Sequence, residues 1–231
     1  MIAQPQADFR YEIKYAANET NAHGIRAWVG SHPSGFRLAY PARRVNSLYL
    51  DTTNRDDLHV NLAGLADRGK LRLRWYGDTT EPEWSVLESK QKRGNVGCKV
   101  TAKCDGPITL HAARHNDIVR AIRKFPIGNL AFSLQSHCNP VLYNHYHRDY
   151  YVSADGLIRL TIDTALHFFD QTCHAVFNDR YREPSVGAMV IELKASEKLR
   201  ERLAQIAGCY PFRATSFSKF SVGQLGMSYV L

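Results

Sequence analysis

Lys70-Leu71-Arg72-Leu73-Arg74-Trp75 alternates strictly between a cation and an apolar side chain. Successive side chains of a β-strand point to opposite faces of the sheet, so this stretch predicts a strand with one basic face and one apolar face. The same division recurs in four other stretches, at 10–15, 86–92, 157–163 and 190–194. The sequence therefore predicts a sheet whose strands share a charged face.

The rest of the chain adds more strands and a few helices. Further strands are expected at 45–51, near 99–103 and at 146–152, which makes about eight. Helical patterns are found at 20–29, 112–124, 196–208 and 217–225. Many strands with few helices predict the α+β class with a largely antiparallel sheet. No linker-like stretch divides the chain, so we expect a disordered N-terminal tail at 1–8 and a single domain at 9–231.

Composition limits the possible functions. The 231 residues are 44% hydrophobic, which is enough for a continuous core. Lys and Arg number 30 against 22 Asp and Glu, and the resulting net charge of +8 favours an anionic partner. Five cysteines without a C-x-x-C pair indicate a reduced, cytoplasmic protein. No stretch of 18 consecutive apolar residues occurs, so no membrane span is expected.

The charged strand faces carry more cations than carboxylates. A face that is simply solvated usually mixes both signs, whereas these faces add only Glu12, Glu88, Asp163 and Glu192 to a larger set of Lys and Arg. We therefore expect a barrel with a basic lumen and an apolar outer face covered by helices. Two like charges 4 Å apart repel by about 4 kcal/mol at an effective dielectric near 20. Such a lumen needs interleaved carboxylates, water or a bound polyanion.

Eight motifs follow one another along almost the whole chain. In chain order they are Arg10-Tyr11-Glu12-Ile13-Lys14-Tyr15, Ser47-Leu48-Tyr49-Leu50-Asp51-Thr52, Arg68-Gly69-Lys70-Leu71-Arg72-Leu73-Arg74-Trp75-Tyr76-Gly77, Leu87-Glu88-Ser89-Lys90, Tyr146-His147-Arg148, Ile158-Arg159-Leu160-Thr161-Ile162-Asp163, Ile191-Glu192-Leu193-Lys194 and Phe217-Ser218-Lys219-Phe220. This series resembles the catalytic domain of the vacuolar transporter chaperone (VTC) family, within the CYTH, or triphosphate tunnel metalloenzyme, superfamily. The superfamily is marked by E-x-E-x-K on the first strand, and Arg10 in place of the first Glu is similar to the VTC branch.

The resemblance implies a fold and a site. The fold would be an eight-stranded antiparallel β tunnel barrel lined by Arg and Lys. Glu192 would hold a divalent metal, Mn²⁺ or Mg²⁺. Lys14, Arg72, Arg74 and Lys219 would be the catalytic cations. The full set of phosphate ligands would be Lys14, Arg72, Arg74, Lys90, Lys99, Arg148, Arg159 and Lys219.

Three functions remain open at this stage. The resemblance favours an ATP-dependent polyphosphate polymerase, whose partners are ATP and inorganic polyphosphate. A tripolyphosphate or nucleoside triphosphate hydrolase would use the same site chemistry with water as the acceptor. A noncatalytic polyanion-binding module is the third. Nucleic acid is the less expected polyanion, because the cations alternate with apolar residues on strands and do not lie beside exposed aromatic side chains.

Overall fold

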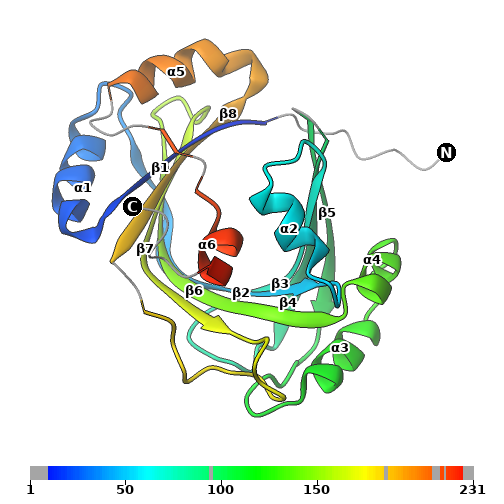
Figure 1. Ribbon diagram of the computed structural model, residues 1–231. Coiled ribbons are helices and arrows are strands. Elements are labelled where there is room, and N and C mark those ends of the chain that lie inside the picture. The colour runs from blue at the N-terminus through cyan, green and yellow to red at the C-terminus, as the bar shows by residue number, and fades with distance from the viewer. Residues whose placement is uncertain (1–9, 94–95, 185–186, 210–213, 216, 226–231) are drawn as a thin grey trace. The chain divides into compact units, whose positions relative to one another are not determined.

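The computed structural model describes residues 10–93, 96–184, 187–209, 214–215 and 217–225 (Figure 1). Eight strands form one sheet in the order β1-β8-β7-β6-β2-β3-β4-β5. The α+β class and the eight-stranded antiparallel sheet are confirmed. The expected tail at 1–8 lies outside the described residues. The strands are β1 (Arg10–Asn18), β2 (Arg37–Asp51), β3 (Arg68–Tyr76), β4 (Trp84–Arg93), β5 (Val96–Asp105), β6 (Asn139–Val152), β7 (Arg159–Asp170) and β8 (Ala188–Ser196).

The described residues also form six α-helices and two short 3-10 turns. The four helices expected from the sequence are present with shifted ends, while α2 and α4 were not expected. Within the described ranges, no helix is long and apolar enough to cross a membrane. The helices are α1 (Ala22–Ser31), α2 (Asp56–Leu62), α3 (His115–Arg123), α4 (Leu130–Ser136), α5 (Arg200–Gly208) and α6 (Lys219–Leu225), and the 3-10 turns are Glu19–Asn21 and Glu197–Leu199.

The chain forms two compact units, each assembled from separate segments. Unit 1 contains residues 1–42, 148–165 and 187–217, and unit 2 contains 43–147, 166–186 and 218–231. In unit 1, β8 pairs antiparallel with both β1 and β7. Its core joins the apolar faces of these strands to the buried side of α1 and α5, which contribute Ile25, Val29, Leu203 and Ile206.

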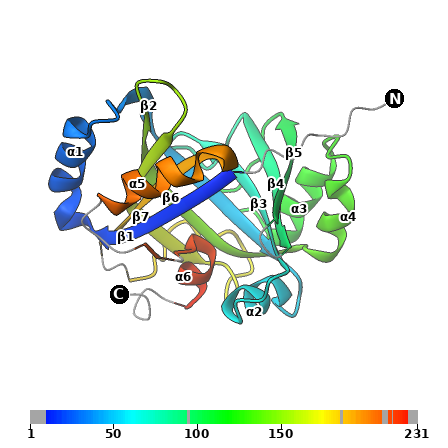
Figure 2. The same ribbon diagram turned by 90° about the horizontal axis from the view of Figure 1, so that it is seen from above.

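Unit 2 has its own sheet region and its own core. Antiparallel pairing runs from β2 through β3 and β4 to β5. The alternate residues Leu71, Leu73 and Trp75 of β3 are at most 2% exposed and pack with Ile118 and Ile122 of α3. Both ribbon views show α3 beside α4 (Figures 1 and 2). The apolar side of the amphipathic helix α3 therefore packs on the apolar face of this sheet region.

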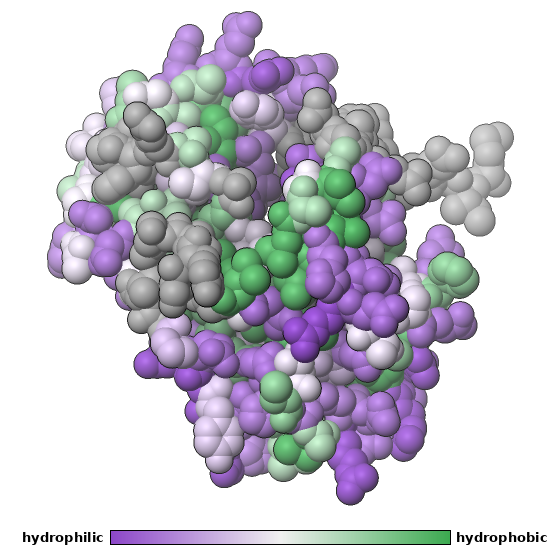
Figure 3. Space-filling model, viewed as in Figure 1, coloured by the Kyte–Doolittle hydropathy of each residue, from purple (hydrophilic) through white to green (hydrophobic). Residues whose placement is uncertain are grey.

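In both units the strand face that packs on the helices is apolar, and in β3 and β8 the charged side chains lie on the opposite face. In β8, for example, Ile191 and Leu193 are fully buried in the unit 1 core while Glu192 belongs to the other face. The space-filling view shows a largely hydrophilic surface with hydrophobic residues gathered over α2 and α6 (Figure 3). The candidate site residues of these strands therefore lie on the charged face.

Candidate functional site

Glu88 is the centre of a cluster of cations in unit 2. The register of β3 and β4 pairs Arg72 with Glu88. The Nη2 of Arg72 lies 2.6 Å from Glu88 Oε2 and its Nε donates to the same oxygen at 2.8 Å. Lys99 Nζ lies 2.6 Å from Oε1, and Arg74 Nη1 lies 3.6 Å from Oε2. We call these four residues the Glu88 cluster.

Burial and charge act in opposite directions on Glu88. The residue is only 5% exposed, and burial by itself would raise its pKa. Arg72, Arg74 and Lys99 outweigh this effect and lower the pKa to about 2. For Arg72, burial disfavours the charge, but Tyr49 and Glu88 raise the pKa above its ordinary value. Glu88 and Arg72 are therefore both ionised at neutral pH.

Aromatic side chains hold the cations of the Glu88 cluster and bring in Lys219. Arg72 Nη1 donates to the Tyr49 hydroxyl at 3.2 Å, and Arg74 Nη2 donates to the Tyr146 hydroxyl at 3.5 Å. Lys219, at the start of α6, lies over the Tyr146 ring at 4.5 Å. Tyr146 thus contacts two of the cations that the resemblance assigns to phosphate.

Three lysines lie in register across β3, β4 and β5 beside this cluster. Lys70 pairs with Lys90, and Lys90 pairs with Lys99. Lys70 Nζ donates to Ser218 Oγ at 2.7 Å. Lys90 and Lys99 are exposed. Unit 2 therefore contains five of the nine predicted site residues, namely Arg72, Arg74, Lys90, Lys99 and Lys219.

Glu192 is the centre of a second cluster, in unit 1. Lys14 pairs with Glu192 across β1 and β8, and Glu12 pairs with Lys194. Lys14 Nζ lies 3.1 Å from Glu192 Oε1 and 3.0 Å from Glu12 Oε1. Lys194 Nζ lies 2.5 Å from Glu192 Oε2. Burial would lower the pKa of Lys14, but Glu192 and Glu12 raise it, so its ammonium stays charged.

Arg148 and Asp163 extend the Glu192 cluster. The guanidinium of Arg148 forms a fork on Asp163, with Nε to Oδ1 at 2.5 Å and Nη2 to Oδ2 at 2.7 Å. Its Nη2 also lies 3.8 Å from Glu192 Oε2. Arg159 pairs with Lys194 in register and is exposed. The structure thus brings Lys14, Arg148 and Glu192 together, and Arg159 lies on β7 in register with Lys194 of β8.

The carboxylates of the Glu192 cluster fit a divalent metal ion. Oxygens of Glu12 and Glu192 lie at 3.0 and 3.1 Å from the same Lys14 nitrogen, so two carboxylates converge on one cation position. Mg²⁺ and Mn²⁺ prefer oxygen ligands, and Mg²⁺ is commonly held by one or two carboxylates together with water and substrate phosphates. A metal would compete with Lys14 for these oxygens. From the sequence, Glu12 is expected only as one of the carboxylates on the charged strand faces, and Glu192 alone is expected as the metal ligand.

A different group of possible ligands lies at the start of α2 in unit 2. Within the described residues, Asp51, Asp57 and His137 are the group whose ligand atoms all lie within 4.8 Å of one another. The Asp51 carboxylate already accepts the backbone N–H groups of Thr52, Asp57 and Leu58. His137 Nε2 lies 3.3 Å from Asp57 Oδ2. These contacts explain the group as a cap of α2.

A known protein family matches the part of the chain that contains the ordered motifs. The profile of the VTC domain matches residues 9–227. The chain belongs to the VTC domain family. The resemblance inferred from the ordered motifs is thereby confirmed. Membership makes this VTC domain a triphosphate-binding protein of the phosphoryl-transfer kind.

Other comparisons add little to the family membership. No curated protein matches this VTC domain. A proposed adenylate cyclase from Vibrio parahaemolyticus has 14% identity and a TM-score of 0.48, and the match covers 92% of this chain and 96% of that chain. A Pyrococcus horikoshii protein has 12% identity and a TM-score of 0.48, with 93% and 97% covered.

Proposed function

We propose that this VTC domain is an ATP-dependent inorganic polyphosphate polymerase, which transfers the γ-phosphate of ATP to the end of a polyphosphate chain. Family membership and one geometric observation support the proposal. A single buried carboxylate, Glu88, is surrounded by Arg72, Arg74 and Lys99. A cluster with this excess of positive charge attracts a polyanion.

Phosphoryl transfer suits a site that offers cations and no nucleophilic side chain. The transition state spreads negative charge over the oxygens of the transferred group, and catalysis consists mainly of positioning and electrostatic stabilisation. In unit 2 the planar guanidinium groups of Arg72 and Arg74 are suited to bind phosphate oxygens as forks, and Lys219 offers a point charge. In unit 1 Lys14 offers a point charge of the same kind. The attacking oxygen comes from the polyphosphate end.

A divalent ion belongs to the proposal. Glu192, assisted by Glu12, would hold Mn²⁺ or Mg²⁺, and the ion would supply positive charge to phosphate oxygens. Around these carboxylates, Lys14 and Lys194 keep the site neutral in the absence of substrate. Arg148 remains fixed by its fork on Asp163.

Product analysis tests the reaction directly. The protein is incubated with ATP and Mn²⁺, and ADP, orthophosphate and long-chain polyphosphate are separated and quantified. The polymerase proposal predicts ADP matched by phosphate in polyphosphate. Orthophosphate matched to ADP would instead identify a hydrolase. Absence of any ATP turnover would contradict both enzymes and favour a polyanion-binding module.

Substitution of the metal ligand tests the assignment of Glu192. Glu192→Gln keeps the side-chain volume and removes the charge. Turnover of ATP with Mn²⁺ should fall by at least about a hundredfold, since metal charge stabilisation contributes several kcal/mol and each 1.36 kcal/mol is about tenfold in rate. Tripolyphosphate affinity in EDTA should be kept or rise, because one repelling carboxylate is removed. The matched control is Glu201→Gln on α5, an exposed glutamate of the same unit. Unchanged turnover in Glu192→Gln would show that the residue is only an ion-pair partner of Lys14 and Lys194.

A further inference from the structure

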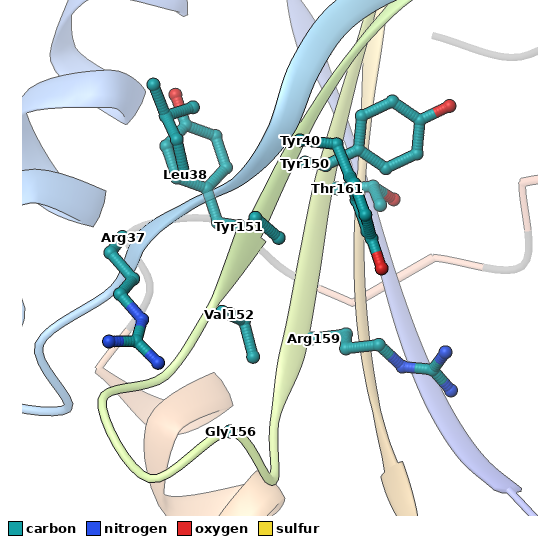
Figure 4. Close-up of a pocket in the computed structure, with 10 residues that line it drawn as sticks. Arg37, Leu38, Tyr40, Tyr150, Tyr151, Val152, Gly156, Arg159 and Thr161 are labelled. Carbon is teal, nitrogen blue, oxygen red and sulfur yellow. The ribbon is translucent and has the colours of Figure 1, made fainter.

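We propose that a cavity of unit 1, lined by Tyr40, Tyr150, Thr161 and Arg159, binds the nucleoside part of the substrate (Figure 4). The inference rests on the proposed function and deepens it, because it assigns a place in unit 1 to the nucleoside of the ATP. The polymerase chemistry itself needs only the phosphate chain. The cavity would bind the base and the ribose.

The cavity has the size of a small-ligand site. Its volume is about 400 Å³, within the range of roughly 300–1,000 Å³ that is common for such pockets. All its lining residues belong to unit 1. They come from the start of β2, the end of β6, the loop after it and the start of β7. The lining includes the two arginines Arg37 and Arg159 and contains no carboxylate.

Aromatic rings form part of the cavity wall. Tyr40 is 62% exposed although it lies within a strand, and its neighbour Leu38 is 66% exposed. The rings of Tyr40 and Tyr150 meet edge to face, with centroids 5.9 Å apart and planes at 90°. This arrangement fixes the Tyr40 ring while much of it remains open. An open, fixed aromatic ring is a stacking surface for a nucleobase.

Thr161 adds a hydrogen-bonding group that the protein does not use. Its Oγ1 is buried and has no hydrogen-bond partner among the described residues. A buried hydroxyl without a partner is unfavourable, and such groups call for a ligand or water. A ribose hydroxyl or a base nitrogen in the cavity would satisfy it. This second observation is independent of the aromatic wall.

Arg159 connects the cavity to phosphate chemistry. Arg159 and Thr161 are two residues apart on β7 and therefore share a strand face. Figure 4 shows the side chain of Arg159 on the same side of the strands as the rings of Tyr40 and Tyr150. A guanidinium binds phosphate oxygens as a planar fork. A nucleoside in the cavity would therefore have its 5′-phosphates beside a guanidinium.

Paired affinities test the inference. The dissociation constants of ATP and tripolyphosphate are measured by calorimetry for the parent, Tyr40→Ala and Thr161→Val. Loss of one base-stacking ring should weaken ATP binding by about five- to a hundredfold and leave tripolyphosphate binding unchanged. Thr161→Val should weaken ATP selectively as well. The control is Tyr181→Ala, a tyrosine that is 73% exposed and lies outside the cavity.

The possible outcomes separate the two proposals. Equal ATP affinity in the parent and in Tyr40→Ala, or equal weakening of ATP and tripolyphosphate, would overturn the nucleoside site and leave the polymerase proposal standing. A parent that binds neither ATP nor tripolyphosphate would overturn the proposed function itself. Selective loss of ATP in Tyr40→Ala, with Tyr181→Ala like the parent, would support the nucleoside site.

Discussion

Glu88 shows how a single residue controls a cluster of like charges. Its carboxylate is within ion-pair distance of Arg72, Arg74 and Lys99, and two of these groups approach to 2.6 Å. Without the carboxylate, the cations would repel one another in a partly buried site. A polyphosphate could replace this neutralisation, because it brings several negative oxygens. Glu88 is therefore both a stabilising residue and a competitor of the substrate.

Glu88→Gln should lower the stability of the protein and remove part of its acid sensitivity. Removing one partner of a buried ion pair lowers the free energy of unfolding by about 3 kcal/mol. Because Lys99 is half exposed, we expect the loss in Glu88→Gln to be at or below this value. The pKa of Glu88 is lowered from 4.5 to about 2. Its contribution to stability is therefore present above pH 4.5 and is lost as the pH falls toward 2.

Urea unfolding of the parent and Glu88→Gln across this pH window provides the measurement. The free-energy difference between the two proteins should be largest near neutral pH and shrink below pH 4.5. Glu83→Gln, at an exposed glutamate just before β4, serves as the control and should behave like the parent. A difference that stays constant from neutral pH to pH 2 would contradict the ion-pair assignment.

At the scale of elements, α6 depends on a glycine that lets it pack closely. A Cβ on Gly223 would lie 2.6 Å from side-chain carbons of both Leu142 and Phe168. This helix carries Lys219, and the ring of Phe220 lies 5.1 Å from that of Tyr49. The close approach of α6 to β6 and β7 therefore supports the position of a predicted phosphate ligand.

Gly223→Ala should destabilise the protein by about 1–3 kcal/mol, because the added methyl group overpacks the core. Gly24→Ala in α1 is the matched comparison, since a Cβ there meets nothing within 4 Å. That change should stabilise by about 0.5–1 kcal/mol through helix propensity. Urea unfolding of both variants checks the prediction. Stabilisation by both substitutions would mean that α6 does not pack as closely as observed.

Period-two alternation predicted most strands because one side of each strand is buried and the other is not. Alternation is missing where the two sides of a strand are buried to the same degree. The first half of β2 is mostly exposed and contains Pro41, which sequence rules place outside regular strands. The start of β6 is buried on both sides from Pro140 to Asn144, so it shows no alternation. A strand that is buried on both faces, or on neither, has no period-two alternation and cannot be recognised by it.

Two helices were missed for a different reason. α2 has seven residues and follows Arg55, which has a left-handed backbone conformation with φ of 56°. Its cap is Asp51, which lies several residues upstream and reaches the helix N–H groups of Asp57 and Leu58. A local capping rule cannot detect a cap at this separation. α4 is equally short and has no side-chain cap.

The sequence predicted the part of the candidate site in which charged residues alternate with apolar ones along a strand. Alternation placed Arg72 and Arg74 on one face, and the fold confirms this placement. The partner of each cation depends on strand register, which a single sequence does not give. Arg148 is accordingly bound to Asp163 of β7, a contact that required the structure. The phosphate role of these residues remains a prediction.

At the scale of the whole molecule, part of the net charge of +8 lies in the Glu88 cluster, where three cations surround one carboxylate. A polyanion that binds the folded chain should therefore stabilise it more than a small anion does. At about 100 times its Kd a ligand adds roughly 2.7 kcal/mol to stability. Each kcal/mol corresponds to about 2–4 °C in Tm for a protein of this size, so tripolyphosphate should raise Tm by roughly 5–11 °C.

Thermal unfolding with tripolyphosphate or with orthophosphate at equal concentration provides the test. Orthophosphate should give a much smaller shift, because it offers fewer negative oxygens to cations that are spaced along strands. Added salt should reduce the tripolyphosphate shift by screening, but a large part should persist, since Arg72 and Glu88 are largely shielded from solvent. Nonspecific attraction by the net charge would behave differently: it would disappear at high salt and would affect a surface-charge variant such as Arg120→Ala as much as Arg72→Ala. Equal shifts with the two anions would exclude a site built for a phosphate chain.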